Sequence, residues 1–335
     1  MELLSIHQII SKMIQIPKGL LAADESVPTI ERRFAAFGID CTPETRRFYR
    51  EMLFTAPDIE KYLSGVILFE ETLDQQTIDG VYFAEFLLNR GILPGIKVDQ
   101  GTQSLVPGSE EKITKGLDDL VERLSVYKSK GAFFTKWRAV ISIGKDMPTE
   151  RCVLENASFL AKYAKIVQEF QMVPIIEPEV LMDGDHDIER CAQVTYKTLK
   201  TVFQAIEREK VDLTGIILKP NMVLPGKVSS EQTSSDEIAK ATLSCLKAVV
   251  PSEVPGIMFL SGGQDSNQAI ENLAEMNKEK NLPWRLSFSY SRALQSPVME
   301  TWRGLEENVK KAQEVFVNIL KKASDASIGV WKAEG

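Results

Sequence analysis

Eight apolar runs, each ending in a polar or charged residue, constrain the fold of this chain more than any other feature. The most informative run is Gly215–Asn221, because it places Lys219 at the end of an apolar, β-branched segment. An ammonium group is costly to bury, so a lysine there is unexpected in an ordinary core strand. The other seven runs are Leu20–Asp24, Val66–Glu70, Gly95–Asp99, Phe133–Arg138, Val173–Glu179, Ile257–Gly262 and Leu286–Ser289.

The spacing of these runs predicts a barrel. Successive runs are separated by roughly 25 to 45 residues, which leaves room for a helix between each pair of strands. We expect helices at 4–16, 42–55, 110–129, 150–170, 186–209, 234–250, 264–279 and 303–322. Eight βα repeats predict an α/β fold, a (β/α)₈ TIM barrel, with its active site at the C-terminal ends of the strands.

The length fits one barrel with insertions. We expect a single catalytic domain over residues 1–335, with a short N-terminal helix before the first strand. The last dozen residues, about 324–335, are small and polar and predict a flexible tail.

Composition excludes several classes of partner. The net charge is −7 and acidic and basic residues are mixed along the chain, which argues against nucleic acid. The sequence shows neither a signal peptide nor an apolar stretch of the ~18 residues that a membrane helix needs. Its four cysteines show no CxxC spacing and are typical of reduced thiols. We therefore expect a cytoplasmic protein without a membrane partner.

Histidine content limits the chemistry. His7 and His186 are the two histidines, so a multi-histidine zinc site is excluded. No nucleophile-elbow, P-loop or G-x-G-x-x-G motif is present. We expect neither a metal nor a cofactor, and chemistry that relies on lysine, arginine and carboxylates.

Two strand ends carry paired charges of opposite sign. Lys136 and Arg138 flank Trp137, and Glu177 and Glu179 flank a proline. Residues i and i+2 of a strand share a face, so each pair points the same way. If those faces point into the barrel, two cations and two carboxylates meet near its mouth.

Lys219 and Asp24 end two further strands and would join this group. Nearby positive charge and desolvation lower the pKa of a lysine and make it a nucleophile. Lys136 is the natural neighbour to supply that charge. Structural salt bridges inside the barrel are the alternative explanation, and four charged strand ends together favour catalysis.

A phosphate site is predicted beside the last two strands. The turn at Ser261, Gly262 and Gly263 lets backbone N–H groups approach an anion at a helix N-terminus. Arg292, just after the eighth strand, would bind the phosphate in bidentate fashion. Lys97 on the third strand would hold a second anion. The alternatives are a plain turn and a solvated lysine.

The chain resembles class I fructose-bisphosphate aldolase from about residue 17 to 320. The motifs that carry the resemblance are Leu21–Ser26, Phe48–Arg50, Gly65–Glu70, Gly95–Asp99, Lys136–Arg138, Pro174–Glu179, Asp183–Asp187, Leu218–Met222 and Leu260–Gln264. The resemblance implies a metal-independent lyase of glycolysis and gluconeogenesis, usually a homotetramer. Its reaction is the reversible cleavage of fructose 1,6-bisphosphate to dihydroxyacetone phosphate and glyceraldehyde 3-phosphate through a lysine Schiff base.

The resemblance also implies a role for individual residues. Lys219 matches the imine-forming lysine, and Glu177 matches the general acid/base of imine formation. Asp24 matches the base at the substrate 4-hydroxyl. Lys136 matches the residue that assists carbinolamine breakdown, and Glu179 matches a carboxylate that supports the lysines.

The resemblance implies a set of substrate contacts as well. Ser261, Gly262 and Arg292 match one phosphate site. The further expected contacts to the substrate and its anions are Lys97, Arg138, Ser26, Arg33 and Ser289.

Other Schiff-base barrel enzymes are the nearest alternative. A transaldolase, or an aldolase that prefers sedoheptulose bisphosphate, differs in acceptor contacts that spacing does not resolve. A catalytically silent sugar-phosphate-binding protein is a second alternative, which the presence of Asp24, Lys136, Glu177 and Lys219 disfavours.

Two departures from the family pattern affect the expected site. The family often has Ser-Tyr-Gly-Arg after the last strand, where this chain has Ser289-Tyr290-Ser291-Arg292. Many members end in a tyrosine that assists proton transfer, whereas the last tyrosine here is Tyr290. We therefore expect altered phosphate affinity and a different or slower route for enamine protonation.

Overall fold

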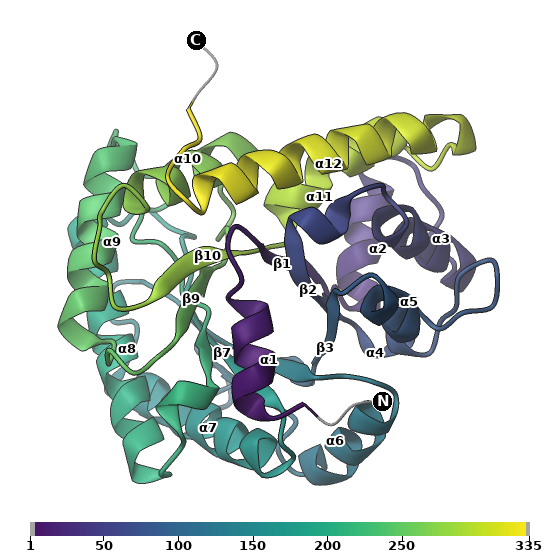
Figure 1. The fold of residues 1–335 in the computed structure, drawn as a ribbon. Coiled ribbons are helices and arrows are strands. Elements are labelled where there is room, and N and C mark those ends of the chain that lie inside the picture. The colour runs from purple at the N-terminus through teal and green to yellow at the C-terminus, as the bar shows by residue number, and fades with distance from the viewer. Residues whose placement is uncertain (1–3, 333–335) are drawn as a thin grey trace.

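Eight parallel strands close into a barrel in the computed structural model, which describes residues 4–332 (Figure 1). The barrel strands are β1 (Gly19–Ala23), β2 (Leu63–Leu68), β3 (Leu93–Lys97), β6 (Phe134–Ile141), β7 (Val173–Val180), β8 (Ile217–Leu218), β9 (Gly256–Phe259) and β10 (Arg285–Tyr290). The ring closes where β1 pairs with both β2 and β10, with Leu20 opposite Ser289. Each predicted apolar run overlaps one strand, so the (β/α)₈ barrel is confirmed.

The helices follow the strands around the barrel. They are α1 (Ile6–Met13), α2 (Val27–Ala35), α3 (Pro43–Phe54), α4 (Glu70–Leu73), α5 (Phe83–Asn89), α6 (Leu120–Ser129), α7 (Glu150–Glu169), α8 (Ile188–Arg208), α9 (Ser235–Val249), α10 (Ser266–Met276), α11 (Arg292–Trp302) and α12 (Val309–Ala326). Short 3₁₀ turns lie at Ile59–Lys61, Leu213–Gly215 and Glu306–Asn308. None of the helices within residues 4–332 has the length and apolarity needed to cross a bilayer.

Two of the expected helices are wrong in part. The first half of 110–129 is not helical and contains strand β5 (Lys112–Thr114), which pairs with β4 (Thr102–Ser104) in a small antiparallel sheet. Gly116 then has a φ of 115°, which no helix accommodates, and α6 begins only at Leu120. The segment 303–322 is likewise shortened at its start, because Arg303 and Gly304 take left-handed conformations that end α11.

The lower half of the barrel interior, which lies toward the N-terminal ends of the strands, is apolar and is covered by α1. Figure 1 shows α1 lying across this end of the barrel. Its buried side chains are Ile6, Ile9, Ile10 and Met13. They join one cluster with inward-facing strand residues such as Phe134, Ile175 and Ile217. A capping box between Ser5 and Gln8 fixes the start of the helix.

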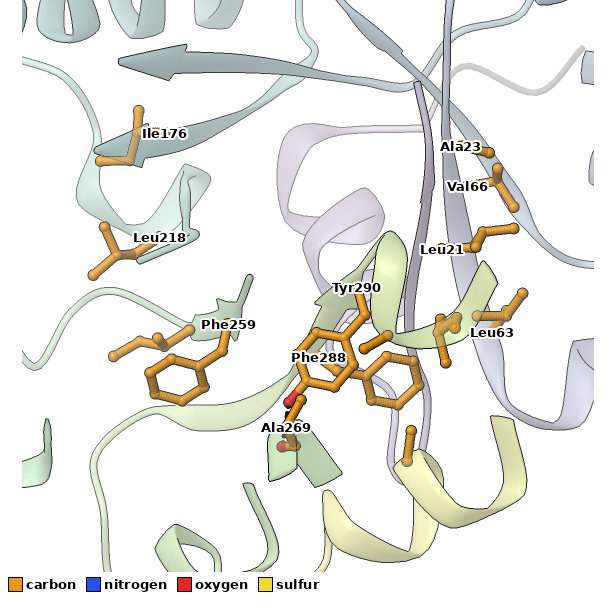
Figure 2. Packing of buried hydrophobic residues seen from close by; sticks show 14 of the residues in the cluster. Leu21, Ala23, Leu63, Val66, Ile176, Leu218, Phe259, Ala269, Phe288 and Tyr290 are labelled. Atoms are coloured by element: carbon orange, nitrogen blue, oxygen red, sulfur yellow. Dashed lines mark hydrogen bonds between the residues drawn. The ribbon is translucent and has the colours of Figure 1, made fainter. Parts of the chain in front are cut away.

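A second apolar cluster lies between the strands and the surrounding helices. Figure 2 shows Ile176, Leu218 and Tyr290 in this cluster, and the Tyr290 hydroxyl donates to the Ala269 carbonyl at 2.8 Å. Successive strand residues alternate in direction. Because Ile176 faces outward, the residues on either side of it along the strand face the barrel axis. The charged residue that follows Ile176 therefore lies inside the barrel.

The C-terminal helix extends further than we expected. Helix α12 runs to Ala326, and both Ser324 and Ser327 are buried. Their hydroxyls donate to the Pro17 carbonyl at 2.9 and 3.1 Å. The start of the segment expected to be a flexible tail is thus an ordered helix end, because its small polar side chains satisfy a buried carbonyl. Residues 333–335 of that expected tail lie outside the described residues.

Candidate active site

A cavity of about 1140 Å³ opens at the C-terminal ends of the barrel strands. This volume slightly exceeds the range of roughly 300–1,000 Å³ that is typical of small-ligand sites. The lining includes every residue that the sequence predicted for the site. Those residues are Asp24, Ser26, Arg33, Lys97, Lys136, Arg138, Glu177, Glu179, Lys219, Ser261, Gly262, Ser289 and Arg292.

Glu177 lies between two lysines at the centre of this cavity. Its Oε1 is 2.9 Å from Lys219 Nζ, and its Oε2 is 3.1 Å from Lys136 Nζ. Lys136 also contacts Asp24 Oδ2 at 2.7 Å and Asp99 Oδ2 at 4.0 Å. All five side chains are buried. The strand ends of β1, β3, β6, β7 and β8 therefore converge as the alternation predicted.

The two lysines have different surroundings. Lys136 has three carboxylates within 4.0 Å, whereas the ion pair of Lys219 is with Glu177. Burial by itself favours the neutral amine of Lys136, yet attraction from Asp24 and Glu177 outweighs it and raises the pKa of that lysine. Lys136 is thus held protonated, and Lys219 is the better candidate nucleophile.

The carboxylates of this group are held ionised. Burial opposes ionisation of Asp24 and Glu177, but attraction from Lys136 and Lys219 is stronger and lowers the pKa of both groups. At neutral pH Asp24 and Glu177 can each accept a proton from a reacting group.

Glu179 pairs directly with Arg138 through Oε2 and the guanidinium Nε. We expected Glu179 to support the lysines, and its direct partner is instead this arginine. Burial lowers the pKa of Arg138, but attraction from Glu179 outweighs it and raises that pKa. Lys97 Nζ contacts Asp99 Oδ1 at 2.7 Å and donates to its carbonyl at 2.6 Å. Both cations lie on the cavity wall beside the central group.

Unsatisfied polar groups gather where β9 and β10 end. The Ser289 hydroxyl is buried, and within residues 4–332 it has no hydrogen-bond partner. Burial, and then repulsion from Arg33, lower the pKa of Arg292. Among the described residues, the Arg292 guanidinium has no carboxylate within 4.0 Å. A desolvated cation and an unpaired hydroxyl that line the same cavity favour a bound anion.

The turn that follows β9 completes this end of the cavity. Gly262 and Gly263 have φ values of 56° and 87°, which glycine adopts without strain. A Cβ on Gly263 would lie 2.8 Å from Lys227 Cε. That lysine side chain is flexible and partly exposed, so it can move aside, and the left-handed backbone conformation is what favours glycine at this position.

A second polar region lies where α2 begins. Ser26 precedes this helix and its Oγ is 3.1 Å from Thr29 Oγ1. Arg33 pairs with Glu25 and donates to the Ser291 hydroxyl at 3.3 Å. Arg33 is partly exposed to the cavity, so its guanidinium is available to an anion.

The comparisons with known proteins agree with this geometry. The family model for class I fructose-bisphosphate aldolases, described as glycolytic, matches residues 5–335. The probable class 1 fructose-bisphosphate aldolase of Xanthomonas campestris pv. campestris is 49% identical over 321 residues, which cover 96% of each chain. The chain belongs to the class I fructose-bisphosphate aldolase family.

Two further aldolases are similar over most of their length. The cytoplasmic isozyme from Spinacia oleracea is 49% identical over 94% of this chain and 88% of its own. A crystal structure of the Plasmodium falciparum aldolase, in complex with TRAP and a small molecule inhibitor, superposes with a TM-score of 0.96. It is 44% identical, with 98% of this chain and 95% of that chain covered.

Membership confirms the predicted activity. This aldolase is a lyase that acts on sugar phosphates and cleaves fructose 1,6-bisphosphate reversibly to dihydroxyacetone phosphate and glyceraldehyde 3-phosphate. Enzymes of this class work through a lysine Schiff base.

Sequence reasoning missed two carboxylates of the aldolase site. Asp99 contacts both Lys97 and Lys136, and its place at the end of the third apolar run could have identified it. Glu25 was missed as well, although it directly follows Asp24. Its carboxylate accepts from Arg50 at 2.6 Å and from Gln295 at 2.8 Å.

Proposed function

We propose that Lys219 forms the imine with the substrate ketone at C2. Glu177, which lies between Lys219 and Lys136 inside the cavity, is the observation that carries this proposal. Glu177 Oε1 is close enough to take the ammonium proton of Lys219, which frees the amine for attack. The same carboxyl group can return that proton when the carbinolamine loses water.

Lys136 would act as a fixed charge in this scheme. Its three carboxylate neighbours keep it protonated while Glu177 changes state. The ammonium group can then assist departure of the carbinolamine hydroxyl, because it can donate a hydrogen bond to the leaving oxygen.

Asp24 would begin the carbon–carbon cleavage. Its carboxylate, ionised beside Lys136, takes the proton of the substrate 4-hydroxyl. The C3–C4 bond then breaks, C4 becomes the aldehyde carbon, and the bonding electrons move into the protonated imine to give an enamine. Protonation at C3 and hydrolysis of the imine release dihydroxyacetone phosphate.

The phosphates would bind at the two polar regions of the cavity. We assign the phosphate next to the imine to Arg292, Ser261, Gly262 and Ser289, because β9 and β10 follow β8 around the ring. The second phosphate would lie toward α2. The residues proposed for its end of the cavity are Ser26, Arg33, Lys97 and Arg138.

Borohydride trapping tests the assignment of the nucleophile. The enzyme is incubated with dihydroxyacetone phosphate, reduced with borohydride, digested and mapped by mass spectrometry. We expect one adduct, on the peptide that contains Lys219. An adduct on Lys136, or none, would contradict the assignment and leave family membership untouched.

We further propose that the protein is a cytoplasmic homotetramer that engages neither nucleic acid nor membrane. The names of relatives support the compartment, since those from Spinacia oleracea and Arabidopsis thaliana are called cytoplasmic or cytosolic. Light scattering coupled to gel filtration tests the assembly, and a particle near the 37.5 kDa of one chain would refute it.

A further inference from the structure

We infer that Ser291 is a positioning residue that ties together the two phosphate-binding ends of the cavity and so favours substrates with two phosphates. This inference rests on the proposed phosphate contacts. Ser291 lies between β10 and α11 and lines the cavity. It precedes Arg292 in the chain, so its backbone starts the helix that presents this arginine.

The Ser291 hydroxyl is used for something other than capping its helix. Ser291 is the N-cap residue of α11, yet its side chain makes no capping hydrogen bond. The hydroxyl instead donates to Glu25 Oε1 at 2.8 Å and accepts from both terminal nitrogens of Arg33 at 3.3 Å. Gln295 Nε2 approaches the same oxygen at 3.2 Å. A hydroxyl offers one donor and two acceptor sites, so these three nitrogens compete for the two acceptor sites and the hydrogen-bonding capacity of Ser291 is filled.

Glu25 gives this arrangement a rigid base. Its carboxylate is buried and accepts from Arg50 at 2.6 Å, while Arg33 pairs with the other oxygen. Burial opposes ionisation of Glu25, but attraction from Arg50 and Arg33 outweighs it and lowers the pKa of this carboxyl group. Arg50 comes from α3 and Gln295 from α11, so two helices hold the anchor in place.

The hydroxyl thereby couples two cations that repel each other. Arg33 and Arg292 both line the cavity, and the charge of Arg33 contributes to lowering the pKa of Arg292. Ser291 restrains the first through its side chain and the second through its backbone. A substrate with a phosphate at each end needs both guanidinium groups in place at once.

The position of the two ends around the ring predicts which phosphate depends on Ser291. Lys219 follows β8, and Arg292 follows β10, two strands further on. Arg33 follows β1, which is one strand beyond β10. The phosphate on C1, next to the imine carbon, therefore belongs to the Arg292 end. The phosphate on C6 belongs to the Arg33 end.

Steady-state kinetics with two substrates test the inference. Ser291→Ala removes the hydroxyl and keeps the Cβ. We expect it to raise KM for fructose 1,6-bisphosphate about tenfold, the scale of a lost hydrogen bond to a charged group, with kcat within about twofold. For fructose 1-phosphate, which lacks the C6 phosphate, KM should stay within about twofold. Ser291→Thr, which keeps the hydroxyl, should retain most of the bisphosphate affinity.

Two controls separate this inference from the site on which it rests. In an Arg33→Ala background, Ser291→Ala should add little to the loss of bisphosphate affinity, because the hydroxyl acts through Arg33. Additive losses, equal losses on both substrates or no loss would overturn the role of Ser291. Arg292→Ala should raise KM for both substrates, and if it raises neither, the proposed phosphate site itself fails. Ser291→Gly serves as the second variant should the alanine variant not fold.

Discussion

The two halves of the barrel interior are built from the same strands and do opposite things. On β6, β7 and β8 an apolar residue in the lower half is followed two positions later by a charged one in the upper half. The pairs are Phe134 and Lys136, Ile175 and Glu177, and Ile217 and Lys219. Two residues along a strand, about 7 Å, separate a dry core from a reactive site.

Burial of side chains contributes favourable free energy in the lower half of the barrel interior and unfavourable free energy in the upper half. Each large aliphatic side chain in the lower half contributes roughly 1.5–3 kcal/mol when it is buried. The charges above cost several kcal/mol each to desolvate, and their pairing only partly offsets that cost. The lower half and the outer cluster therefore stabilise a scaffold on which the upper half can hold charges ready for chemistry.

Replacement of Lys219 should have the largest effect. Lys219→Met removes the proposed nucleophile, and we expect kcat to fall by about 10⁴-fold or more. The fold should survive, because Glu177 keeps its contact with Lys136. Turnover and borohydride trapping measure the effect, and a variant with near-normal kcat would end the proposed mechanism.

Replacement of Lys136 should affect stability as well as activity. Lys136→Met leaves Asp24, Asp99 and Glu177 around an apolar side chain, and we expect the free energy of unfolding to drop by about 3–5 kcal/mol. Urea unfolding measures this change. Arg292→Met is the matched control, since no carboxylate among the described residues pairs with that arginine. If both variants lose the same free energy of unfolding, the proposed contrast between the paired cation Lys136 and the unpaired cation Arg292 is wrong.

Acid should remove the part of the free energy of unfolding that the charged groups of the upper half contribute. Asp24 and Glu177 have lowered pKa values in the folded state. Their contribution to stability is therefore complete above their unfolded pKa values of about 4 and is lost as the pH falls below that range. We expect a loss of about 1–3 kcal/mol between pH 5 and pH 2.5 in urea titrations. Asp24→Asn should flatten this slope, and an unchanged slope would show that other carboxylates cause it.

The smallest effect should come from the lower half of β8. Ile217→Val removes one buried methylene two residues before Lys219. We expect about 0.5–1.5 kcal/mol less stability and an unchanged kcat. A drop in kcat of tenfold or more would mean that packing in the lower half controls the position of Lys219.

Regular features of the sequence predicted the barrel and its central charges. Strand alternation and the strand-end rule are local, so they placed Asp24, Lys136, Glu177 and Lys219 without knowledge of distant contacts. The same rule pointed at Asp99, whose role went unrecognised because its partner Lys97 was interpreted alone.

The errors have long-range or conformational causes. The role of Glu25 depends on its hydrogen bonds with Arg50 on α3 and Gln295 on α11. The packing of these two helices cannot be predicted from a linear sequence pattern. Helix α11 was missed, and it contains Pro297, which ordinarily ends a helix. Gly116 shortened another predicted helix through a backbone conformation that spacing does not reveal.

The pairing of Leu20 with Ser289 joins the two ends of the barrel sequence. Contacts between residues so far apart in sequence form slowly, so we expect barrel closure to be a late step of folding. Lys136, Glu177 and Lys219 lie on three consecutive strands and can meet in an unfinished sheet. Asp24 joins them only when β1 docks. During refolding, the spectroscopic signal of the helices should therefore return before the aldolase activity. Recovery of turnover would then report closure of the barrel.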